Sequence, residues 1–152
     1  MPETPVWLDQ LFPLIQERLA AGESVQFTPR GISMRPMIEG GRDQVVLSPL
    51  PEKLKKYDLP LYRRKNGQFV LHRIVKVCKD GTYTCCGDHQ CQLEKGLRHE
   101  QMIGLATSYV RKGKKLTNKN LLYRFYRMTW TWVRKYRWVF FGIDNKLRRK
   151  KS

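Results

Sequence analysis

The sequence predicts a mainly β fold: one compact antiparallel β domain with a short helix before it and a basic helix after it. Short runs rich in β-branched and aromatic residues, separated by Gly and Pro, fill residues 25–112, which is typical of antiparallel strands. Asn66-Gly67 and Asp80-Gly81 each join two such runs, and these dipeptides favour the tight turns of β-hairpins. With 152 residues, 41% of them hydrophobic, the chain can fill the core of one modest domain.

Residues 1–24 are expected to form the N-terminal helix. Pro13 is expected to bend this helix and Gly22 to end it. The segment has acidic residues near its start and no basic region, so it lacks the pattern of a secretory signal and predicts a cytoplasmic protein. Its apolar residues recur with a roughly helical period, at Val6, Trp7, Leu11, Leu14, Ile15 and Leu19.

The β domain is expected to contain five short strands and a closing one. Each run is bounded by Gly, Pro or polar turn residues, and its length suits a strand rather than a helix. The runs, in order, are VQFTP, DQVVLSP, LPLYRR, QFVLHRIVKVC, TYTCC and the closing MIGLATSYVRKG.

The C-terminal part, residues 113–152, is expected to be a polar linker, GKKLTNKN, followed by a basic amphipathic helix. Residues 111–152 hold 15 of the 30 Lys and Arg residues but only one of the 13 acidic residues, Asp144. One face of the expected helix carries Arg124, Arg127, Arg134 and Lys135. The opposite face carries Leu122, Phe125, Tyr126, Val133, Tyr136 and Phe140.

This basic aromatic tail suits a phosphate-rich partner. Peripheral membrane association through residues 121–151 is favoured over nucleic acid, and packing of the helix back on the β domain is an equally good alternative. No run of 18 or more residues is free of charge, so no transmembrane helix is expected.

Four cysteines lie within 14 residues, which invites comparison with a zinc site. They form no C-x-x-C pair, and the adjacent Cys85 and Cys86 would point to opposite faces of a strand. Reduced, partly buried thiols are therefore the favoured interpretation for Cys78, Cys85, Cys86 and Cys91, with no metal and no cofactor.

Ser33 lies between Ile32 and Met34 in a stretch rich in Gly and Pro, RGISMRPMIEGG. A serine hydroxyl is a weak nucleophile until a base removes its proton, so a catalytic serine needs a partner. Of the three histidines, His72 is flanked by apolar and β-branched residues that would hold its imidazole in place as a general base. By itself, His72 would more simply be a structural histidine.

Four segments in order, GISMRPMI, GRDQVVL, HRIVKV and YTCCGDHQ, resemble the signal-peptidase-like serine peptidases, which include the autoproteolytic domains of LexA-type repressors. The resemblance covers about residues 25–110 and implies the β fold of that family. A histidine followed by arginine at the position of the base is similar to the archaeal, endoplasmic-reticulum and sporulation types of signal peptidase. The family's membrane anchor has no counterpart here.

The resemblance implies that Ser33 is the nucleophile, His72 the general base and Asp88 the carboxylate that orients the imidazole. The family's second aspartate is absent and Glu94 is the nearest carboxylate, so the third member of the triad stays open. The family binds its substrate as an added β-strand, with Gly31, Ile32 and Met34 expected beside it. Core packing is the favoured role for Met34, Met37 and Ile38.

These observations predict a serine endopeptidase that cleaves leader or signal-like segments from a peptide or protein substrate. Two alternatives remain. One is a self-processing domain that cuts near Ala21, although a helix ending at Gly22 explains that sequence more simply. The other is an inactive peptidase-like domain whose tail binds a membrane surface or nucleic acid.

Overall fold

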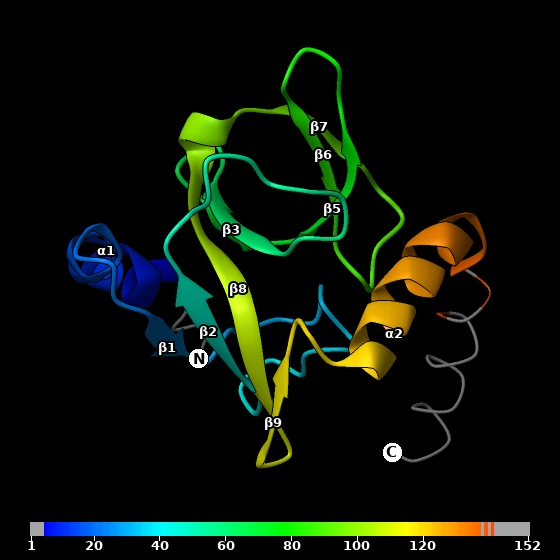
Figure 1. The fold of residues 1–152 in the computed structure, drawn as a ribbon, viewed down its shortest axis with the longest axis horizontal. Coiled ribbons are helices and arrows are strands. Elements are labelled where there is room, and N and C mark those ends of the chain that lie inside the picture. Colours follow the sequence, from blue (N-terminus) through cyan, green and yellow to red (C-terminus); the bar gives the residue numbers. More distant parts are fainter. Residues whose placement is uncertain (1–4, 138, 140, 142–152) are drawn as a thin grey trace.

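The computed structural model describes residues 5–137, 139 and 141. They form two antiparallel sheets with a helix at each end of the chain, so the prediction of a mainly β fold is confirmed. The helices α1 (Pro5–Ala20) and α2 (Leu121–Trp132) lie on opposite sides of the β structure (Figure 1). Phe140 of the predicted apolar face and the basic end of the tail lie outside the described residues.

The first sheet has six strands in the order β1-β2-β8-β3-β4, with β9 paired to β8. The long strand β8 occupies its centre and pairs with β2, β3 and β9. β1 and β4 are the two ends of the path, and each pairs with one neighbour in the described part of the chain. The strands are β1 (Val25–Phe27), β2 (Gln44–Ser48), β3 (Pro60–Arg63), β4 (Phe69–Leu71), β8 (Met102–Arg111) and β9 (Lys114–Thr117).

The second sheet has three strands in the order β5-β6-β7. They are β5 (Arg73–Val77), β6 (Tyr83–Cys86) and β7 (Glu94–Leu97). A short 3-10 helix, η1 (His99–Gln101), leads from β7 into β8, and thus from the second sheet back to the first. All four side chains of β6 are buried because it lies between β5 and β7 and packs on the core.

Both predicted hairpins are confirmed. β3 and β4 pair across the Asn66-Gly67 turn, and β5 and β6 pair across the Asp80-Gly81 turn. Gly67 and Gly81 have φ angles of 90° and 82°, a left-handed conformation that glycine adopts at little cost. The turns therefore form where local chemistry favours them.

The run QFVLHRIVKVC, expected as one strand, is two. It pairs with β3 as far as Leu71 and with β6 from Arg73 onward, so the chain leaves the first sheet and enters the second at His72. His72 therefore lies between the two sheets and is paired with a strand of neither.

Core packing fixes the first helix, and a side-chain cap marks the start of the second. On α1, Ile15 and Leu19 are buried in the core, and the chain turns out of the helix at Gly22, whose φ is 80°. On α2, the Asn120 side chain accepts a hydrogen bond from the Tyr123 N–H and caps the helix. A second 3-10 turn, η2 (Val133–Tyr136), follows α2.

The expected polar linker at residues 113–120 differs in the structure. Lys114–Thr117 forms strand β9 and pairs with the end of β8 through the turn at Lys112 and Gly113. Only three residues, 118–120, therefore separate α2 from a strand of the main sheet, so the helix is attached by a short connection rather than by a long linker.

Candidate active site

A tight loop after β1 carries Ser33. Gly31 has a φ of 88°, and a Cβ placed on Gly40 would lie 2.2 Å from the Gly31 carbonyl oxygen. Only glycine at position 40 therefore allows the two arms of the loop to approach so closely. At the end of the loop, the buried carboxylate of Asp43 accepts the N–H of Glu39 at 2.8 Å and fixes the return into β2.

His72 lies at the junction of β4 and β5 and is only 3% exposed. Its Nδ1 atom lies 3.2 Å from Oε1 of Glu94 and 3.4 Å from the hydroxyl oxygen of Tyr62. Glu94 begins β7, so a neighbouring strand of the second sheet supplies the carboxylate. These contacts fix the plane of the imidazole ring.

Burial lowers the pKa of His72 below its usual value, and the charge of Arg64 lowers it further, while the carboxylate of Glu94 acts in the opposite direction. The ring is therefore neutral near pH 7. A neutral imidazole that donates its Nδ1 proton to Glu94 has an unprotonated Nε2. This tautomer, assigned from the hydrogen-bond network, is the one that a general base needs.

The carboxylate of Glu94 is ionised because Arg64 holds it. Arg64 donates to both carboxylate oxygens, with an Nε–Oε2 distance of 2.9 Å. Burial alone would raise the pKa of Glu94, but the hydrogen bonds and charge of Arg64, together with a hydrogen bond from Tyr62, lower it. A negative charge next to Nδ1 stabilises the imidazolium that forms when the ring accepts a proton.

The turn formed by residues 87–90 brings Ser33 next to His72. The His89 N–H donates to the Ser33 carbonyl oxygen at 2.8 Å, and the Asp88 N–H lies 3.4 Å from the sulfur of Met34. A Cβ placed on Gly87 would lie 2.6 Å from the Ser33 carbonyl oxygen and 3.1 Å from Nε2 of His72. Both groups therefore lie against Gly87, on the side of the ring opposite Glu94.

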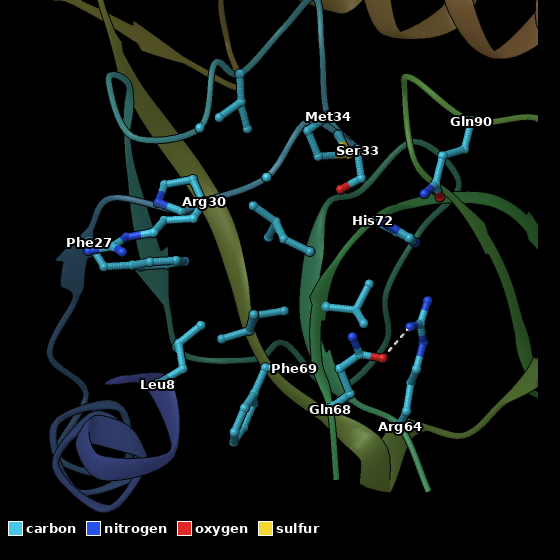
Figure 2. A pocket seen from close by; sticks show the side chains of 17 residues that line it. Leu8, Phe27, Arg30, Ser33, Met34, Arg64, Gln68, Phe69, His72 and Gln90 are labelled. Carbon is cyan, nitrogen blue, oxygen red and sulfur yellow. Dashed lines mark hydrogen bonds between the residues drawn. The ribbon is translucent and has the colours of Figure 1, made fainter. Parts of the chain in front are cut away.

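Ser33 and His72 both line a pocket of about 230 Å³, although 39 positions separate them in the sequence. Figure 2 shows Ser33, His72 and Gln90 at one end of this pocket and the apolar side chains of Leu8 and Phe27 at the other. Within the part of the chain that the structure describes, the backbone N–H and the hydroxyl of Ser33 have no hydrogen-bond partner. Both groups are thus available to a ligand in the pocket.

Asp88 does not have the position that the resemblance implied. Its carboxylate forms a buried, two-pronged ion pair with Arg73, with both N–O distances 2.8 Å, and accepts the hydroxyl of Tyr126 at 2.9 Å. The carboxylate in contact with the imidazole is that of Glu94, the other residue that the sequence left open for the third place in the triad.

The C-terminal helix holds the 87–90 turn from the other side. Nη1 of Arg137, a residue only 1% exposed, donates to the carbonyl oxygens of Gly87, Asp88 and Gln90 at 3.1 to 3.3 Å. The indole N–H of Trp130 donates to the Asp88 carbonyl at 2.7 Å. The C-terminal helix thus packs back on the β domain, one of the two alternatives that its sequence left open, and it supports the turn that positions Ser33.

The three residues expected beside the substrate have different positions. Gly31 lines the pocket, and Met34 lines it while being 5% exposed, so Met34 is a core residue with one side toward the pocket. The predicted core role of Met37 and Ile38 is confirmed, since both are 2% exposed. Ile32 is 52% exposed and is not among the residues that line the pocket.

Sequence reasoning missed three features of this site: Tyr62, the pairing of Arg64 with Glu94, and the close approach at Gly87. The apolar run around Tyr62 gives no sign that its hydroxyl faces His72. The sequence leaves Glu94 open as a member of the triad but gives no sign that Arg64 pairs with it. The Gly-Asp pair at positions 87 and 88 was the available signal, and its glycine proves more directly involved in the site than its aspartate.

The cysteines form no disulfide among the described residues, where Cys85 and Cys86 are buried and Cys91 is exposed. Burial raises the pKa of the Cys86 thiol and keeps it protonated. The described residues include no group of three or more His, Cys, Asp and Glu side chains placed to hold a metal ion. None of the described helices combines the length and the apolar character needed to cross a membrane.

Comparisons of the chain with protein-family models, with curated proteins and with solved structures returned no match.

Proposed function

We propose that the protein is a serine endopeptidase of the signal-peptidase and LexA fold type, with Ser33 as nucleophile, His72 as general base and Glu94 as the residue that orients the base. One observation carries the proposal. The Ser33 carbonyl oxygen and Nε2 of the buried His72 lie against the same glycine in one pocket, the N–H and hydroxyl of Ser33 have no partner among the described residues, and Nδ1 of the histidine contacts the carboxylate of Glu94. Structural histidines do not need this combination.

The reaction would follow the acyl-enzyme route. Nε2 of His72 removes the Ser33 hydroxyl proton as the oxygen attacks the peptide carbonyl carbon, and the resulting imidazolium is stabilised by Glu94. The same proton passes to the leaving amine when the peptide C–N bond breaks. Water then attacks the acyl-enzyme with His72 again as the base, which releases the new carboxyl terminus and restores Ser33.

The backbone N–H of Ser33 is the candidate donor to the oxyanion of the tetrahedral intermediate. It donates to no atom of the described residues and belongs to the residue that makes the new bond. A single fixed donor of this kind contributes about 10²- to 10³-fold in rate. Further donors would come from the backbone around it.

An extended peptide is the substrate that fits the pocket. Residues of β1 and β4 line it, and each strand pairs with only one neighbour among the described residues. Their free edges can bind the backbone of an added strand. The apolar side chains of Phe27 and Phe69 border the same space (Figure 2), so apolar substrate residues are favoured there.

The proposal is tested with a fluorophosphonate probe and a peptide library, with products identified by mass spectrometry. The wild-type protein is expected to carry the probe on Ser33 and to cleave a subset of peptides, and the Ser33→Ala and His72→Ala variants are expected to lose both activities. Ser24→Ala, which changes an exposed serine elsewhere, is the matched control and should behave like the wild type. Equal product patterns for wild type and Ser33→Ala would contradict the proposal.

The same experiment separates a peptidase from a self-processing domain. A peptidase acts on added peptides with turnover. A self-processing domain would cut only its own chain, near Ala21, at a rate independent of protein concentration. In the structure Gly22 closes the C-terminus of α1, where its N–H donates to the Leu19 carbonyl at 3.0 Å, so the local sequence already has a structural role.

A further inference from the structure

We propose that the outward face of α2 and of the helical turns that follow it is a docking surface for an anionic lipid bilayer. This surface, named here the outer stripe, consists of seven apolar side chains that are each at least 43% exposed in the single chain. Leu122 and Trp132 are the most exposed, both at 81%. The outer stripe comprises Leu121, Leu122, Phe125, Met128, Trp132, Tyr136 and Val139.

The orientation of α2 leaves the outer stripe no place in the core. Tyr123, Tyr126, Trp130 and Arg137 hold the other face of the helical segment through hydrogen bonds to Arg73, to Asp88 and to the 87–90 turn. Each of these four side chains faces inward and forms a hydrogen bond with a defined partner. The helix cannot rotate to bury Phe125 and Trp132 without breaking them, so its apolar residues face outward because its polar contacts face inward.

Such a face is unusual for a protein that remains in water. From Leu122 onward, the residues of the outer stripe follow one another at intervals of three or four, so they form one continuous surface. Contiguous apolar patches of this kind mark interaction sites. Trp132 and Tyr136, whose rings have an apolar body and a polar tip, suit the boundary between lipid headgroups and acyl chains.

The positive charge around the outer stripe favours an anionic bilayer over the other possible partners. Residues 111–152 carry 15 basic residues and one acidic residue, and Lys119 and Arg124 are exposed next to the outer stripe. An anionic bilayer provides both an apolar layer and negative headgroups. A second copy of the chain would bring the same positive charge. Nucleic acid offers phosphates but no apolar layer for leucine, methionine and valine.

This proposal does not rest on the proposed peptidase activity. It depends on the exposure of α2 and on charge, whereas the peptidase proposal depends on Ser33 and His72. A lipid-binding result with the inactive Ser33→Ala variant would therefore leave the docking surface supported whatever the activity assays give.

The test is flotation of the full-length chain with vesicles of phosphatidylcholine alone or of phosphatidylcholine containing phosphatidylglycerol. We expect the protein to float with the anionic vesicles and not with the neutral ones, and binding to weaken as salt is added. The double variant Phe125→Ser/Trp132→Ser is expected to bind anionic vesicles at least about tenfold more weakly, because two large rings no longer enter the interface.

The matched control is Leu14→Ser/Val77→Ser, which removes two exposed apolar side chains from other elements and should bind like the wild type. Circular dichroism melting curves check that each variant is folded. Absence of binding to anionic vesicles, or equal binding by Phe125→Ser/Trp132→Ser, overturns the proposal. Two other results would also overturn it. One is a wild-type dimer in sedimentation that Phe125→Ser/Trp132→Ser no longer forms. The other is salt-sensitive binding to duplex DNA that this variant loses, in a protein that does not bind vesicles.

Discussion

Nδ1 of His72 lies 3.2 Å from a carboxylate oxygen of Glu94, although the two residues come from different segments of the chain. His72 marks the crossing between the sheets, and Glu94 begins the last strand of the second sheet. The small sheet thus acts as a support that presents a carboxylate to the base. Its hairpin is held in turn by the buried Arg73–Asp88 ion pair.

Glu94→Gln tests the role of that carboxylate. An amide keeps the shape of the side chain but removes the negative charge that stabilises the imidazolium and fixes its tautomer. We expect kcat to fall by about 10²-fold or more, with little change in KM. Steady-state kinetics on a cleaved library peptide measures the effect, and the exposed Glu100→Gln is the control. Wild-type kcat in Glu94→Gln would remove Glu94 from the mechanism.

Asp88→Asn is expected to affect stability rather than the chemistry of the base. It leaves the buried Arg73 guanidinium without its anionic partner, and breaking a buried ion pair in this way costs about 3 to 5 kcal/mol. Urea denaturation followed by tryptophan fluorescence measures the loss. The opposite result would be an Asp88→Asn variant with the urea midpoint of the wild type and a kcat as low as that of Glu94→Gln. It would show that Asp88 rather than Glu94 orients His72.

Gly87→Ala places a methyl group against both the Ser33 carbonyl oxygen and the ring of His72. The added Cβ would lie within 3.1 Å of both the Ser33 carbonyl oxygen and Nε2 of His72, so one of them must move. We expect a large fall in kcat/KM together with a stability loss of about 1 to 3 kcal/mol. Gly81→Ala, which strains a hairpin turn remote from the pocket, should lose stability and keep its activity per folded molecule. Full activity in folded Gly87→Ala would contradict the proposed geometry.

The pH dependence of kcat/KM follows from the lowered pKa of His72. The base is active only when neutral, so activity is kept as the pH falls through the usual histidine value of about 6.5 and is lost only below it. Glu94→Gln removes a group that raises this pKa, so the acidic limb of its profile should move to lower pH. A wild-type limb centred above the usual histidine pKa would show that another group controls activity.

Local turn chemistry made part of the fold predictable. Asn66-Gly67 and Asp80-Gly81 specify their hairpins within a few residues, and both formed as expected. β7, with the sequence EKGL, and β9, with KKLT, have no apolar alternation, so only their pairing with other strands makes them strands. The break of the QFVLHRIVKVC run at His72 likewise follows from which sheet each half joins, and the run itself carries no sign of it.

The sequence allowed the catalytic side chains of the candidate site to be proposed, but it did not allow their contacts to be predicted. Ser33 and His72 could be chosen by their side-chain chemistry. Asp88 could not be assigned correctly, because Arg73 and Tyr126 compete for its carboxylate and only the fold brings them together. The predicted apolar face of the C-terminal helix is divided in the structure. Leu122 and Phe125 are exposed, whereas Tyr126 faces inward and its hydroxyl donates to Asp88.

Because Arg137 contacts the 87–90 turn, the site can be completed only late in synthesis of the chain. Ser33, His72 and Glu94 all leave the ribosome before the residues that complete the support of that turn. On the proposed mechanism, we therefore expect the nascent chain to be inactive until the helical segment that contains Arg137 has emerged, so that it cannot cut itself or its neighbours during synthesis. Probe labelling of ribosome-bound chains stalled before and after residue 137 has emerged measures this delay, and equal labelling of the two would exclude it.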